Sequence, residues 1–148
     1  MRNISLLLAA AVVTCVSTLA LARDTHLKLP IKDALENPTA RERLGTDIKF
    51  IFGAPAPAGA KDLGTFMSNK KTNFANKTDK EGCEWAFLSA MLSFKDRAIA
   101  EGGNAVVNIH SYYKKNHFSS TTEYECGAGA IMGGVTFKGT VVRLEGAG

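Results

Sequence analysis

The sequence lacks the short motifs that identify common enzyme classes. It contains no G-x-S-x-G turn for a serine nucleophile, and no serine stands in a context that indicates an adjacent histidine base. Segment 53–61 does not match the phosphate-binding loop G-x-x-x-x-G-K-[ST], because neither Ser nor Thr follows Lys61. With no catalytic signature present, we predict that the protein is not an enzyme and has no cofactor.

The sequence also has little excess of charge of either sign. The chain carries 18 Lys and Arg residues against 14 Asp and Glu residues, which gives a net charge of +4. A dedicated nucleic-acid binder concentrates much more positive charge on one face. We therefore expect no nucleic-acid partner, whereas attraction to an anionic surface is compatible with this balance.

Residues 1–22 are predicted to be a signal peptide. A positive residue precedes a mostly apolar stretch, and Ala20-Leu21-Ala22 fits the small-x-small pattern that is cleaved before Arg23. The alternatives are an uncleaved membrane anchor, since about 20 apolar residues can span a bilayer, and a lipoprotein acylated at Cys15. We expect a periplasmic or secreted chain of residues 23–148, without a transmembrane segment once the signal peptide is removed.

Cysteine is sparse, with three residues in the whole chain, and cleavage would remove Cys15. An even pair in an exported chain is most simply a disulfide, so we predict a bridge between Cys83 and Cys126. The alternative is a two-thiolate metal site. That site would need two further ligands, and the sequence has no C-x-x-C clip from which to build it.

The first half of the mature chain is predicted to form short elements joined by loops. We expect a strand over 26–29, helical turns over 31–35 and 40–44, and a strand over 48–52. The Pro- and Gly-rich segment 53–64 is predicted to be a loop. The Lys- and Asn-rich segment 68–80 is predicted to be a solvated connection.

The second half has clearer periodicity. Apolar residues from Phe87 to Ile99 recur at three- and four-residue spacing, which predicts an amphipathic helix over 81–101 that ends at Gly102-Gly103. Alternation predicts three strands, over 104–110, 121–126 and 135–144. A long hairpin loop over 111–120 is predicted to join the first two strands. The glycine-rich segment 127–134, before the third strand, is predicted to form a bulge or close backbone packing.

These elements predict an α+β fold. An antiparallel sheet packs on one main amphipathic helix at residues 81–101, and one disulfide ties the start of the helix to the second of the three strands. At this size, residues 23–148 are expected to form a single domain. We find no internal repeat.

The second half resembles a known domain over about residues 83–144. The features that carry the resemblance are Cys83, a helix ending in Arg97-Ala98, the run G-N-A-V-V from Gly103, and Cys126-Gly127 before a closing strand. They resemble the C-terminal domain of RcsF, an outer-membrane sensor of envelope stress, and the wider group of YbjQ-like domains. The resemblance implies the fold and a bridge between the equivalent cysteines.

The departures from RcsF limit what the resemblance implies. The RcsF domain has two disulfides and this chain has cysteines for one, and neither a lipobox nor a Pro-rich tether is evident. The signalling role is therefore not implied. The whole mature chain also resembles small exported bacterial proteins of unknown role, some of which are called excinuclease ATPase subunits. That name does not fit a chain without a phosphate-binding loop.

Two groups of residues in the second half are candidates for function. The first interleaves aromatic and cationic side chains in the hairpin loop and is predicted to be a contact surface for an envelope protein or an anionic partner; it consists of Tyr112, Tyr113, Lys114, Lys115, His117 and Phe118. The second, His110, His117 and Glu123, has the side chains of a zinc site. We expect a non-enzymatic, envelope-associated binding protein, with a small metal-binding protein as the alternative.

Overall fold

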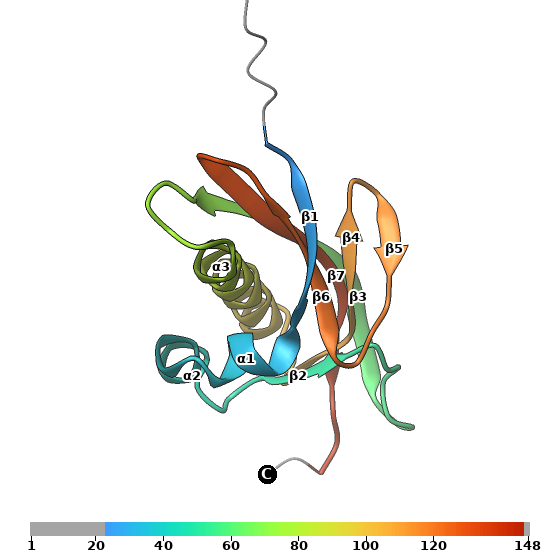
Figure 1. Cartoon of the computed structure of the whole chain (residues 1–148). Coiled ribbons are helices and arrows are strands. Elements are labelled where there is room, and N and C mark those ends of the chain that lie inside the picture. Colours follow the sequence, from blue (N-terminus) through green and yellow to red (C-terminus); the bar gives the residue numbers. More distant parts are fainter. Residues whose placement is uncertain (1–22, 147–148) are drawn as a thin grey trace, which may run out of the picture.

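In a computed structural model, residues 23–146 form one long helix packed against a curled, mixed sheet (Figure 1). The segment predicted to be a signal peptide lies outside these described residues. The helices are α1 (Ile31–Glu36), α2 (Pro38–Leu44) and α3 (Asp79–Ala100). The strands are β1 (Thr25–Pro30), β2 (Lys49–Phe52), β3 (Lys61–Asn73), β4 (Ala105–Tyr113), β5 (Asn116–Phe118), β6 (Glu123–Ala128) and β7 (Met132–Arg143).

The sheet is organised around β7. Along the main path the strand order is β1-β6-β7-β4-β2, while β3 pairs with β7 and β5 pairs with β4. All these pairings are antiparallel except that of β2 with β4, which is parallel. The predicted α+β class is therefore confirmed, with a mixed and mostly antiparallel sheet.

Helix α3 begins two residues before the predicted start because Thr78 caps it. The Thr78 hydroxyl accepts a hydrogen bond from the amide of Glu81 and so satisfies one of the open donors of the first turn. Phe87 and Met91 are fully buried against the sheet. Ile99, which the periodicity places on the apolar face, is 57% exposed because it lies in the last turn, beyond the sheet's cover.

The predicted disulfide is present. Cys83, the fifth residue of α3, is bonded to Cys126 in β6, with Cα atoms 5.9 Å apart. Both residues are fully buried. The bridge therefore joins the helix to the sheet inside the core, as the predicted order of the elements implies. No helix within residues 23–146 is long and apolar enough to cross a membrane.

Segments predicted to be loops contribute strands instead. Most of the polar segment 68–80 belongs either to β3 or to the start of α3, and the predicted loop over 53–64 ends where β3 begins at Lys61. The reason is tertiary, because β3 pairs with β7 in continuous register from Thr65 to Asn73. Ser68 is buried and donates to the carbonyl of Ala90 in α3.

The predicted long loop over 111–120 is largely a tight hairpin. β4 continues to Tyr113, and Lys114 and Lys115 both take positive φ angles, 51° and 65°, before β5 begins. Turns of this kind usually carry Asn or Gly, so two lysines give no hairpin signal. The hairpin stands on the side of the molecule away from α3 (Figure 1).

Candidate functional site

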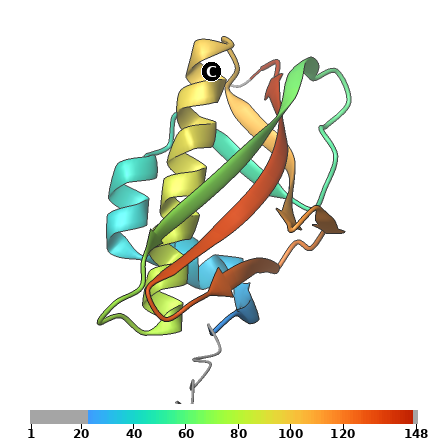
Figure 2. The same cartoon turned by 90° about the horizontal axis from the view of Figure 1, so that it is seen from above.

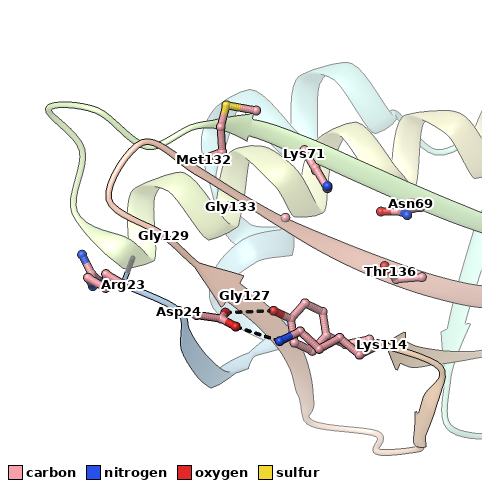
Figure 3. A pocket seen from close by; sticks show the side chains of 12 residues that line it. Arg23, Asp24, Asn69, Lys71, Lys114, Gly127, Gly129, Met132, Gly133 and Thr136 are labelled. Carbon is pink, nitrogen blue, oxygen red and sulfur yellow. Dashed lines mark hydrogen bonds and ion pairs between the residues drawn. The ribbon is translucent and has the colours of Figure 1, made fainter. Parts of the chain in front are cut away.

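A cleft of about 390 Å³ lies at the meeting point of the N-terminal segment, β3, the β6–β7 turn and the tip of the β4–β5 hairpin. Helix α3 runs behind the sheet, so the cleft opens on the opposite face (Figure 3). Its lining combines cationic, polar and glycine residues: Arg23, Asp24, Asn69, Lys71, Tyr113, Lys114, Gly127, Gly129, Met132, Gly133, Gly134 and Thr136.

The glycine at position 127 allows the hairpin to form one wall of this cleft. A Cβ atom built on Gly127 would lie 2.2 Å from the hydroxyl oxygen of Tyr113, far inside van der Waals contact. The Tyr113 side chain can therefore lie against β6 only because residue 127 has no side chain. The close backbone packing predicted for segment 127–134 is thus present, and it positions the hairpin tip.

The N-terminal segment and the hairpin tip are joined through Asp24. Lys114 Nζ donates to Asp24 Oδ2 at 2.7 Å, and the Tyr113 hydroxyl donates to Asp24 Oδ1 at 3.3 Å (Figure 3). The hydrogen bond and charge of Lys114 lower the pKa of Asp24, and the same contact raises the pKa of Lys114. Burial, with the nearby Asp24 charge, raises the pKa of Tyr113, so its hydroxyl stays a hydrogen-bond donor.

The charge around the cleft is predominantly positive. Arg23, Lys71 and Lys114 line it against a single carboxylate, Asp24. Arg23 also forms an ion pair with Asp79 at the start of α3. Lys71 forms no ion pair within residues 23–146. The cleft therefore presents one uncompensated cation, Lys71, beside two cations that are already paired with carboxylates. A positive lining of this kind attracts a carboxylate or phosphate group.

Behind Tyr113 lies a contact between the buried carboxylate of Glu125 and the half-exposed ring of His26, which sequence reasoning missed. Glu125 is only 4% exposed and contacts the His26 ring of β1. The His26 ring packs at 5.1 Å, centroid to centroid, from that of Tyr113. Only the pairing of β1 with β6 brings these residues together, and no local sequence signal announces a pairing of strands so distant in the chain.

The hairpin residues predicted to form a contact surface do not share one face. Tyr113 and Lys114 line the cleft. Elsewhere on the hairpin, Lys138 lies 4.0 Å over the Tyr112 ring and Lys28 lies 4.3 Å over the Phe118 ring. These two aromatic rings are therefore covered by lysines of β7 and β1, and Lys115 and His117 are exposed.

The predicted metal-binding residues are only partly brought together. The His110 and His117 rings are 4.0 Å apart between centroids, and His110 Nδ1 lies 2.8 Å from the Asn108 carbonyl oxygen. Burial lowers the pKa of His110. Glu123 is the first residue of β6 and is paired with Pro30, and residues 23–146 contain no group of three or more side chains placed to hold a metal ion.

Comparison of the chain with protein-family models, curated proteins and solved structures found no match.

Proposed function

We propose that this protein is a non-enzymatic binding protein of the periplasm or the secreted fraction, and that it holds an anionic group of an envelope partner in the cleft beside the β4–β5 hairpin. The main observation in support of this proposal is the positively charged lining of the cleft. Cations from three separate segments, Arg23, Lys71 and Lys114, surround a floor that is rich in glycine. Carboxylates and phosphates are the groups that such a lining recognises.

Two further observations support the extracytoplasmic part of the proposal. Disulfides persist in oxidising compartments, and the Cys83–Cys126 bridge is buried in the core of this domain. Residues 1–22 have the sequence pattern of a signal peptide. The resemblance of residues 83–144 to the RcsF and YbjQ-like domains points in the same direction.

Capture from an envelope fraction tests this proposal. The bait is the mature chain, residues 23–148, immobilised through its C-terminus so that the cleft stays open. We expect it to retain one or more envelope components that are eluted by salt, because the contact is electrostatic. The variant Tyr112→Ala/Tyr113→Ala/Lys114→Ala/Lys115→Ala, which strips the hairpin, should retain much less of the same components.

A matched control separates the cleft from general positive charge. The variant K71E/K114E reverses two cleft cations, and K32E/K49E reverses two exposed cations that do not line the cleft. Loss of capture with K71E/K114E alone supports the proposal. Equal loss with both variants, or capture that survives K71E/K114E, contradicts it.

The second candidate function is metal binding, which the close contact between the rings of His110 and His117 favours. The burial that lowers the pKa of His110 also keeps its ring neutral, the form that ligates metal. Elemental analysis of protein purified without a histidine tag decides this candidate. Bound zinc or copper that is lost in H110A/H117A supports it, whereas metal-free protein that fails to take up either ion removes it.

A further inference from the structure

Strand β3 has one edge that no other strand covers in the described part of the chain. It pairs with β7 along its length, and its other edge faces outward beside α3 (Figure 2). The register with β7 is continuous from Thr65 to Asn73, a straight run of about 30 Å at the usual strand rise. That length is enough to pair with a peptide of six to nine residues.

The backbone groups along this edge are open to a partner. In residues 23–146, no backbone hydrogen bond from outside β7 reaches the strand between Thr65 and Thr72. The lysine side chain of residue 77 bonds to the Asn73 carbonyl and so closes only the end of the run. An unpaired row of N–H and C=O groups is a template for one more strand.

A groove of about 390 Å³ lies beside this edge, between β3, α2 and α3. Leu92 of α3 contributes an apolar surface to it, and Arg43, Lys70 and Lys71 contribute cations against one carboxylate, Asp96. None of these three cations forms an ion pair within the described residues. A strand added to β3 would direct every second side chain toward this groove.

The charge of the edge selects its occupant. In an antiparallel pairing of two copies centred on Lys70 and Lys71, these lysines would face each other, and like charges opposite each other are destabilising. Lysines on an edge strand also discourage pairing with neutral strands. An acidic strand meets neither obstacle, because its carboxylates would be placed against Arg43, Lys70 and Lys71.

We propose that the free edge of β3 binds an extended acidic peptide segment by β-strand addition, with alternate side chains of the peptide in the groove between β3 and α3. Backbone hydrogen bonds to β3 supply affinity, and carboxylates matched to Arg43 and Lys70 supply selectivity. This site is separate from the cleft, although Lys71 lies between the two.

Fluorescence anisotropy with three sets of labelled nine-residue peptides tests this proposal. In the first set Glu alternates with Val, Ile, Leu or Thr. The second has Lys in place of Glu. The third repeats the acidic set with two adjacent central residues N-methylated, which removes donors from both edges of the peptide strand. We expect the first set to bind at least about tenfold more tightly than either of the others.

Charge reversal on the protein locates the binding. R43E/K70E changes exposed groove residues that do not line the cleft, and K32E/K49E is a control with the same change in net charge. We expect R43E/K70E to weaken binding about tenfold and K32E/K49E to have little effect. Amide hydrogen exchange of residues 65–72 should slow when the acidic peptide binds.

Three outcomes would overturn the proposal. No binding of the acidic set at millimolar concentration excludes an acidic peptide at this edge. Equal affinity for the N-methylated set shows that charge alone holds the peptide. Equal effects of R43E/K70E and K32E/K49E place the peptide elsewhere. The cleft proposal survives each of these results, because its own test uses K71E/K114E.

Discussion

At the scale of single residues, two neighbouring polar side chains on β6 are both buried, but only one of them has a polar partner. The carboxylate of Glu125 is buried but contacts the His26 ring, whereas the hydroxyl of Tyr124 is buried without a hydrogen-bond partner within residues 23–146. Burial raises the pKa of Tyr124 strongly, so the ring stays neutral among Phe87 and Phe137. An orphaned hydroxyl of this kind costs free energy.

Replacing Tyr124 by Phe should therefore stabilise the protein. The substitution keeps the ring and removes the unsatisfied hydroxyl, so we expect the free energy of unfolding to rise by about 1 kcal/mol. Urea unfolding of the two proteins measures the change. A loss of 1 kcal/mol or more would show that the hydroxyl has a partner in solution and would contradict this description of the core.

His110 should make stability depend on pH. Burial lowers its pKa below the ordinary 6.5, and the charges of His117 and Lys138 act in the same direction while the Asn108 carbonyl opposes them. The unfolded chain then takes up the proton at higher pH than the folded one. The stability contributed by neutral His110 is complete above pH 6.5 and is lost as pH falls through the folded pKa.

An NMR titration of the His110 ring in the presence of EDTA checks this prediction. We expect the midpoint below pH 6.5. The variant His117→Asn removes one of the two charges that lower the pKa of His110 and should move the midpoint upward. A wild-type midpoint at or above 6.5 would show that the ring is not buried as described.

At the scale of elements, the sequence predicts α3, β4, β6 and β7 because the apolar residues of each recur with the period of its secondary structure. It does not predict β3, since Lys61–Asn73 is mostly polar and forms a strand only because β7 pairs with it. The turn of the β4–β5 hairpin was missed for a related reason. Lys114 and Lys115 adopt positive φ angles that residue type alone does not indicate.

The bridge between α3 and β6 should contribute several kcal/mol to stability. It joins residues 43 positions apart, and a loop of that size corresponds to roughly 4 kcal/mol of chain entropy in the unfolded state. We expect Cys83→Ser/Cys126→Ser to lower the melting temperature by about 10 °C or more. Thiol titration of the denatured wild-type protein, purified from the periplasm, should detect no free thiol, and two reactive thiols would exclude the bridge.

Gly127 couples β6 to the hairpin. Its replacement by Ala places a methyl group against the Tyr113 ring, so we expect a loss of about 1–3 kcal/mol in the free energy of unfolding. In a Tyr113→Ala background the same change should cost little, because the obstructing ring is gone. A double-mutant cycle by urea unfolding measures this coupling. The same cost in both backgrounds would mean that Tyr113 does not pack on Gly127.

At the scale of the whole molecule, the cleft is a product of the topology. Its walls come from the first described residues, from β3, from the glycine-rich β6–β7 turn and from the hairpin. Of its residues, only Tyr113 and Lys114 were singled out from the sequence as a contact surface. Arg23, Asp24 and Lys71 carry no local signal, because their relevance depends on strand pairings across most of the chain.

NMR chemical-shift mapping with citrate and inorganic phosphate tests the central claim, that the cleft binds anionic groups, most directly. In a protein of residues 23–148 we expect saturable shifts at the amides of Tyr113, Gly127 and Gly134, persisting in R43E/K70E and absent in K71E/K114E. Shifts scattered over the surface without saturation, or shifts that K71E/K114E leaves unchanged, would contradict the account.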